Sequence, residues 1–161
     1  MNLAFRTIVV ATDFSDASAL ALEYARVLAK RFGAGLRVLH VVATPRPLGT
    51  EIYVPEAMSV SDVAVADAQR LMGETLAKFE GTPVVGQVLV GNPARKIVEY
   101  ASDHDVDLLV IGTHGRSGLS HLLMGSVAER VVRTAPCPVF TTRGSAALEI
   151  ADDERGAVAI L

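Results

Sequence analysis

The stretch DLLVIGTHGRSGLSHLLMGS, residues 107–126, joins a short apolar run to a glycine-rich loop and then to a helix start. The run at residues 107–112 is typical of a strand that is buried on both faces of a parallel sheet. Four of the 13 glycines fall between Gly112 and Ser126. Glycine loses more conformational entropy on folding than other residues, so such a concentration indicates a loop that turns sharply or approaches a ligand closely. We therefore predict a strand–loop–helix unit whose loop is a candidate binding site.

The same strand-then-helix unit recurs along the whole chain. Apolar runs that predict strands alternate with stretches of helical period, which begin at capping residues and end at glycine or before proline. The predicted strands are residues 7–12, 36–42, 84–90, 107–112 and 139–142, and the predicted helices run from Ser15 or Asp16 to Gly33, over residues 61–79, from Asn92 to about His104, and from Gly125 or Ser126 to before Pro136. This alternation predicts a three-layer α/β sandwich.

Two amphipathic stripes complete the helix predictions. We expect the first helix to face the core with Leu20, Tyr24, Val27, Leu28 and Phe32, and the second with residues of the same spacing: Val65, Ala68, Leu71, Met72, Leu76 and Phe79. Apolar positions three and four residues apart lie on one side of a helix.

Topology places a ligand crevice within this fold. Right-handed crossovers favour a five-stranded parallel sheet in the order 3-2-1-4-5, in which the direction of winding reverses between the first and fourth strands. The loops that leave these two strands begin at Asp13 and Gly112. Ligands usually bind where such a reversal occurs, so the glycine-rich loop falls where a site is expected.

Composition narrows the class of protein. A chain of 161 residues that is 50% hydrophobic can fill one core, and a net charge of −3 gives no overall attraction to nucleic acid or to acidic membranes. No segment approaches the roughly 20 apolar residues that span a bilayer, and the N-terminus lacks the apolar run of a signal peptide, so we expect a cytoplasmic protein. The single cysteine, Cys137, excludes an intrachain disulfide and is interpreted as a small core residue.

The glycine-rich loop has the elements of a phosphate site. Gly112 and Gly115 would leave backbone amides accessible to phosphate oxygens, and Arg116 offers a guanidinium group. Gly125 and Ser126 open the next helix, whose first amides and dipole favour an anion. The alternative is a loop that only turns, with Ser126 as an ordinary N-cap. Neither GxGxxG nor GxxxxGK[ST] occurs, so the loop is neither a dinucleotide fingerprint nor a P-loop.

These residues resemble a known family. The pattern of Gly112-Thr-His-Gly115, nine residues and Gly125-Ser126 is similar to that of the ATP-binding branch of the universal stress protein family. The fragments IVVATDFSDAS, LHVV, GNPARKIVEYA and APCPVFTTR also resemble segments of that family, in the same order. The resemblance covers residues 1–143, which we expect to form one universal stress protein domain of the adenine nucleotide alpha-hydrolase-like, Rossmann-like type, with residues 144–161 as a C-terminal tail.

The resemblance implies that ATP, accompanied by Mg²⁺, binds across the strand ends. Asp13 would accept hydrogen bonds from the nucleoside, Val41 would meet adenine, and the glycines, Ser126 and the Val127 amide would hold ribose and phosphates. The implied contact residues are Ala11, Thr12, Asp13, Val41, Gly112, Thr113, His114, Gly115, Gly125, Ser126 and Val127, and we add Arg116 because of its charge. Members of the family commonly form dimers through the last strand, so the resemblance implies a homodimer through Val139 to Thr142.

Several residues have structural alternatives. Asp13 is also a candidate cap of the first helix, Val41 a core residue, and Asn92 with Pro93 a helix start. His114 and His121 lack a third ligand nearby and make a poor metal site, and we expect His40 and His104 to be incidental. Residues 43–60 form a long loop that is a candidate lid, and the tail from Gly144 is either a strand that covers a sheet edge or a loosely packed terminus.

Three functions remain open from the sequence. The favoured one is an ATP-binding regulatory module without catalytic residues, because no residue at the phosphate end is placed to position an attacking water. The second is a weak ATPase of the same fold. The third is a dimeric interaction module that binds no nucleotide, against which the intact glycine pattern argues.

Overall fold

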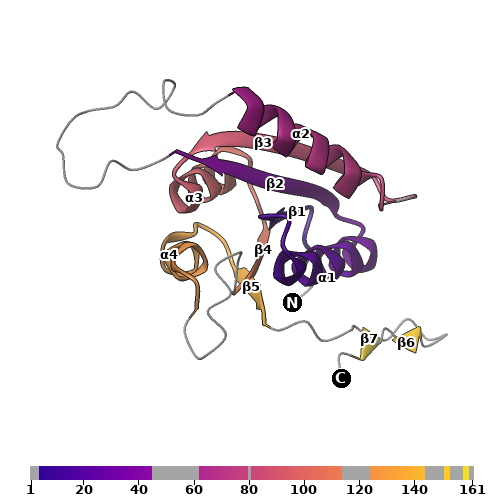
Figure 1. Cartoon of the computed structure of the whole chain (residues 1–161). Helices are drawn as coiled ribbons and strands as arrows, with labels where there is room; N and C mark the ends of the chain where they lie inside the picture. Colours follow the sequence, from indigo (N-terminus) through magenta and orange to yellow (C-terminus); the bar gives the residue numbers. More distant parts are fainter. Residues whose placement is uncertain are drawn as a thin grey trace.

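The fold is a five-stranded parallel sheet between two layers of helices (Figure 1). The structure is a computed structural model that describes residues 4–44, 62–79, 81–113 and 124–143, together with the backbone of two short strands at 151–152 and 158–159. Its elements in chain order are β1 (Thr7–Ala11), α1 (Asp16–Phe32), β2 (Gly35–Ala43), α2 (Asp62–Leu76), β3 (Val84–Gly91), α3 (Pro93–Asp103), β4 (Leu108–Gly112), α4 (Ser126–Thr134), β5 (Val139–Thr142), β6 (Ala151–Asp152) and β7 (Val158–Ala159). The strand order β3-β2-β1-β4-β5 confirms the predicted topology and fold class.

The sheet separates two apolar cores. Alternate residues of a strand point to opposite faces, so β1 sends Ile8 and Val10 into one core and Val9 and Ala11 into the other. Helices α1 and α2 cover the first core, and α3 and α4 cover the second (Figure 1). Because β1 and β4 are buried on both faces, their sequences are continuous apolar runs rather than alternating ones.

Helix α1 begins and ends as its sequence predicts, but it buries a different face. Ser15 is the N-cap and accepts a hydrogen bond from the Ser18 amide, and Gly33 ends the helix in the left-handed conformation at φ 63°. The predicted stripe of large side chains is only partly buried, and Phe32 is exposed. The fully packed face instead carries small and medium side chains: Ser18, Ala21, Leu22, Ala25 and Ala29. Small residues allow the helix axis to lie close to the sheet, and the larger ones flank the contact.

The other helices differ from prediction mainly at their ends. Helix α2 stops at Leu76, and Phe79, which was predicted as its last residue, lies beyond the helix yet is buried in the core. Asn92 caps α3 by accepting a hydrogen bond from the Arg95 amide at 3.0 Å, so the predicted helix start is confirmed. In the tail, β6 and β7 pair with each other as a separate antiparallel sheet. The described part of the tail therefore adds no strand to the main sheet.

Asp107 ties the start of β1 to the start of β4. It was predicted to open the strand but lies one residue before β4. Its Oδ2 accepts hydrogen bonds from the amides of Arg6 at 2.8 Å and Thr7 at 2.9 Å. These amide donors, with the positive charge of Arg6, stabilise the carboxylate and lower the pKa of Asp107.

Candidate functional site

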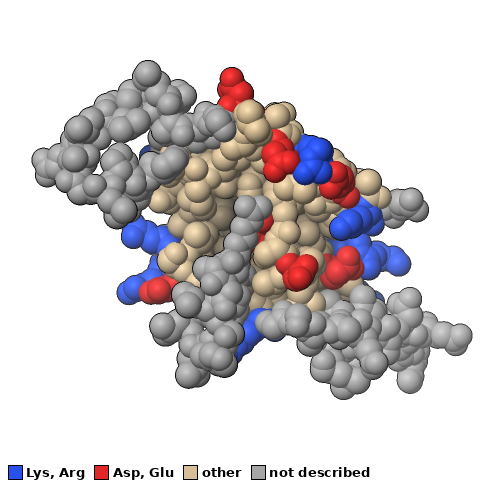
Figure 2. All heavy atoms as spheres, in the orientation of Figure 1, with Lys and Arg blue, Asp and Glu red and all other residues tan. Residues whose placement is uncertain are grey.

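A cavity lies where the carboxyl ends of β1, β2 and β4 meet the starts of α2, α3 and α4. Its volume is about 570 Å³, which is within the range of small-molecule sites. Figure 2 shows the molecule in the orientation of Figure 1: uncharged side chains predominate between α2 and α3, and acidic and basic side chains gather along α2, over α1 and at the edges. Among the described residues, the lining contains the carboxylates of Asp13 and Asp67 but no lysine or arginine.

Most of the predicted contact residues come together at this cavity. Both loops at the reversal of winding contribute to it, as the topology requires. The predicted residues that line it are Ala11, Thr12, Asp13, Val41, Gly112, Thr113, Gly125, Ser126 and Val127. His114, Gly115 and Arg116 lie outside the described residues, as do His121 and nearly all of the 43–60 loop.

A chain of hydrogen bonds shapes the β1–α1 loop. The Ser18 hydroxyl donates to the Ser15 carbonyl oxygen at 2.9 Å, so the Thr12 hydroxyl donates to Ser18 Oγ, also at 2.9 Å. Thr12 Oγ1 in turn accepts from the Phe14 amide at 3.0 Å. Phe14 adopts φ 63°, a left-handed conformation that is strained for an aromatic residue. The hydroxyl chain helps to hold this conformation at the cavity wall.

The carboxylate of Asp13 is held by the same loop. Asp13 Oδ1 accepts hydrogen bonds from the Ser15 amide at 3.1 Å and from the Ser15 hydroxyl. The N-cap of α1 is Ser15, so the alternative in which Asp13 caps this helix is wrong. A carboxylate that is fixed in a cavity wall can accept hydrogen bonds from ligand hydroxyl or amino groups.

The start of α4 presents backbone donors to the cavity. Its N-cap is Gly125, which has no side chain to cap the helix, and Ser126 is the first helical residue. The alternative in which Ser126 is an ordinary N-cap is therefore wrong. Within the described residues, the amides of Ser126, Val127 and Ala128 have no hydrogen-bond acceptor, and all three residues line the cavity. Such a helix end favours an anion through its amides and its dipole.

The Gly125 amide has a different role from the one expected of it. It donates to the Thr113 carbonyl oxygen at 2.7 Å, so it is not available to a phosphate. Thr113 also donates its amide and its hydroxyl to the Thr142 carbonyl oxygen, at 2.8 and 3.0 Å. A Cβ on Gly125 would lie 3.2 Å from the Thr113 oxygen. Glycine at 125 thus allows the α4 start to dock closely against the end of β4.

Sequence reasoning missed part of the cavity wall. His40, which we expected to be incidental, lines the cavity, bonds through Nδ1 to the Thr12 carbonyl oxygen at 2.8 Å, and packs its ring against Phe14 with centroids 4.4 Å apart. Helix α2 adds Ala64, Asp67, Ala68 and Leu71. Val41 is both a core residue and a lining residue, and Pro93 lines the cavity as well as starting α3.

Other candidate chemistries receive no support from the described residues. No group of three or more His, Cys, Asp or Glu among them is placed to hold a metal ion. Burial raises the pKa of the Cys137 thiol, which disfavours the reactive thiolate. No helix in this part of the chain is long and apolar enough to cross a membrane.

Comparison with known proteins identifies the family of the chain. The sequence model of the universal stress protein family matches residues 4–143. The chain belongs to the universal stress protein family. A universal stress protein of Methanocaldococcus jannaschii is 35% identical over 141 residues, covering 86% of this chain and 82% of its own length. One from Thermus aquaticus is also 35% identical over 141 residues, covering 86% and 99%.

Solved universal stress proteins share the fold, and two of them are complexes with nucleotides. UspA from Lactobacillus plantarum has a TM-score of 0.70 and 28% identity, covering 88% of this chain and all of its own. A universal stress protein in complex with cAMP has a TM-score of 0.65 and 26% identity, covering 87% and 98%. One from Archaeoglobus fulgidus in complex with dAMP has a TM-score of 0.66 and 25% identity, covering 86% and 98%.

Proposed function

We propose that this universal stress protein binds ATP in the cavity, with the phosphates at the start of α4. The observation that carries the proposal is the set of three unpaired amides, within the described residues, at Ser126, Val127 and Ala128. These amides and the helix dipole suit a phosphate, and the Ser126 hydroxyl adds a donor. The nucleotide complexes of two solved relatives support an adenine nucleotide as the ligand.

The remaining walls suit a nucleoside. Asp13 is held by Ser15 in the loop that follows β1, and β1 is the neighbour of β4 in the sheet. Its carboxylate would accept hydrogen bonds from ribose hydroxyls. Val41 and the apolar residues of α2 would enclose the base. Residues 112–116, of which the last three lie outside the described residues, are proposed to complete the phosphate site.

Mg²⁺ is proposed to accompany the triphosphate. The described lining has no lysine or arginine to neutralise several phosphate charges. It also has no cluster of carboxylates that would form a complete cage for the ion. Mg²⁺ in such sites is held largely by phosphate oxygens and water, which this cavity allows.

The activity that best fits the cavity is regulation rather than catalysis. Of the two described carboxylates of the lining, Asp13 on the β1–α1 loop is assigned to the ribose, and Asp67 lies on α2. Neither is placed to position a water at the terminal phosphate, so hydrolysis should be slow. We propose that ATP occupancy changes the loops at 112–125 and 43–60 and thereby changes partner binding.

Two further proposals concern assembly and location. We propose that residues 1–143 act as one domain that forms a homodimer through the free edge of β5, Val139–Thr142. We also propose a cytoplasmic location, where ATP is abundant.

Calorimetric titration with ATP and Mg²⁺ tests the proposed function. Saturable heat with one site per chain supports ATP binding. The absence of heat at millimolar nucleotide contradicts ATP binding and favours an interaction module that binds no nucleotide. Steady phosphate release that is lost in Ser126→Ala or Arg116→Ala would instead favour the weak ATPase.

A further inference from the structure

One wall of the cavity is a face of α2. Ala64, Asp67, Ala68 and Leu71 recur at intervals of three and four residues, so they lie along one side of the helix, and all four line the cavity. Three of them are small or aliphatic, so this wall is apolar with a single carboxylate. A planar heterocycle could lie against the apolar part with its edge toward Asp67.

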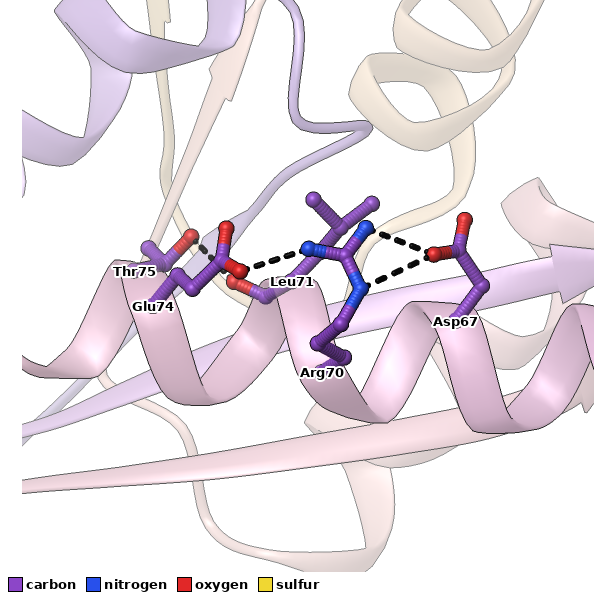
Figure 3. Close-up of polar contacts among 5 residues, drawn as sticks. All are labelled: Asp67, Arg70, Leu71, Glu74 and Thr75. Atoms are coloured by element: carbon purple, nitrogen blue, oxygen red, sulfur yellow. Dashed lines mark hydrogen bonds and ion pairs between the residues drawn. The ribbon is translucent and has the colours of Figure 1, made fainter.

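The Asp67 carboxylate is oriented by its neighbour on the helix. Arg70 donates to Asp67 Oδ1 from Nη2 at 2.7 Å and from Nε at 3.2 Å, and its third bond goes to Glu74 (Figure 3). Both of the bonds to Asp67 end on the same oxygen. The second oxygen, Oδ2, points away from the guanidinium group in Figure 3 and has no hydrogen-bond partner among the described residues. Asp67 is therefore a lining residue with one carboxylate oxygen that has no partner among the described residues.

The position of α2 puts Asp67 at the base end of the proposed nucleotide. Across the sheet the order runs from β4, which leads to the phosphate site, to β1 with Asp13, and then to β2 with Val41. Adjacent strands are about 4.8 Å apart, so β2 lies about 10 Å from β4. Helix α2 packs over β2 and β3. A nucleotide that extends from α4 past Asp13 would reach α2 with its base.

We propose that Asp67 selects adenine over 6-oxo purines by accepting a hydrogen bond from the exocyclic 6-amino group. This inference rests on the proposed nucleotide site. A 6-oxo group is an acceptor, so hypoxanthine or guanine would set an oxygen against the carboxylate without a hydrogen atom between them. A site that is built to bond an amino group rejects an analogue that lacks it.

The size of the effect follows from exposure. The side chain of Asp67 is 56% exposed, so water competes for its free oxygen and the discrimination falls below that of a buried pair. A hydrogen bond to a charged group at such a position corresponds to a change of about five- to tenfold in the ratio of affinities.

The test compares ATP with inosine triphosphate, which differs by the 6-oxo group and the proton on N1. Calorimetry with Mg²⁺ is performed on the wild type, Asp67→Asn and Glu74→Gln. Glu74 pairs with the same Arg70 but does not line the cavity, so its variant is the matched control for the loss of one charge from the network. We expect the wild type to prefer ATP, Asp67→Asn to lower that preference by about five- to tenfold, and Glu74→Gln to leave it unchanged.

The outcomes separate this inference from the proposed function. If the wild type binds ATP but Asp67→Asn keeps the full preference, or loses both ligands equally, the role of Asp67 is overturned and nucleotide binding stands. A wild type without preference, or a Glu74→Gln variant that matches Asp67→Asn, overturns it as well. If the wild type binds neither nucleotide, the proposed function fails first and the role of Asp67 with it.

Discussion

Replacing Ser126 with proline removes one backbone donor from the proposed phosphate site without removing a hydrogen bond of the described fold. Ser126 is the first residue of α4, where the amide has no intrahelical acceptor and proline is favoured. The preceding residue, Gly125, already has φ −58° and ψ 146°, which is the extended conformation that a following proline requires. The bond from the Gly125 amide to Thr113 is untouched. We expect the free energy of unfolding to change by less than about 1 kcal/mol.

The effect on ATP affinity should be much larger than the effect on stability. Ser126→Ala removes only the hydroxyl, whose bond to a charged phosphate oxygen contributes about 1.5 kcal/mol, so the affinity should fall roughly tenfold. Ser126→Pro also removes the amide, whose bond to a charged phosphate oxygen contributes about 1.5–3 kcal/mol, or roughly a further 10- to 100-fold. Calorimetry with ATP and Mg²⁺ measures both affinities, and thermal unfolding verifies the fold. Equal affinities of the two variants would refute the reasoning.

Three further predictions concern the fold and the assembly. Asp107→Ala should lower the free energy of unfolding at pH 7 by about 1–2 kcal/mol, since it removes the acceptor for the amides of Arg6 and Thr7. The pKa of Asp107 is lowered in the folded state, so its contribution to the free energy of unfolding is present above the ordinary aspartate pKa and is lost as the pH falls through the folded value. Urea unfolding should therefore show that the difference in stability between the wild type and Asp107→Ala becomes smaller toward acidic pH. Thr141→Pro should abolish the proposed dimer and retain ATP binding. Thr142 bonds to the end of β4, so in a parallel ladder the neighbouring Thr141 directs its amide to the free edge of β5. A dimer that persists in sedimentation velocity would contradict the proposed interface. Thr142→Val should raise the melting temperature or leave it unchanged, because the buried hydroxyl of Thr142 has no partner in the part of the chain that the structure describes, and a clear decrease would contradict this.

The strands and their order could be predicted because strands that are buried on both faces appear in the sequence as continuous apolar runs. β1 and β4 are central in the sheet, so their buried residues are apolar, and the helices between them begin and end at recognisable caps such as Asn92 and Gly33. Topology then fixes which two loops meet, which is why Asp13 and Gly112 were correctly placed at one cavity.

The α2 wall could not be predicted because it depends on how closely this helix packs. A Cβ at Gly86 of β3 would lie 2.7 Å from side-chain atoms of both Met72 and Leu76, so glycine allows α2 to approach the sheet. That approach brings Ala64 and Asp67 to the cavity. The carboxylate within the apolar stripe of α2 was the available signal.

Two details of the loops also lacked a sequence signal. Phe14 adopts a left-handed conformation that aromatic residues rarely take, and this conformation accompanies its ring contact with His40. The Gly125 amide is engaged because the Thr113 carbonyl turns toward it, which depends on the course of the backbone after β4.

The central claim is that the amides at the start of α4 bind the phosphates of ATP. Following backbone amide resonances by NMR while Mg²⁺ and ATP are added tests it most directly. We expect saturable shifts at Ser126, Val127 and Ala128 with the affinity that calorimetry gives. Saturable binding that leaves these three resonances in place would contradict it.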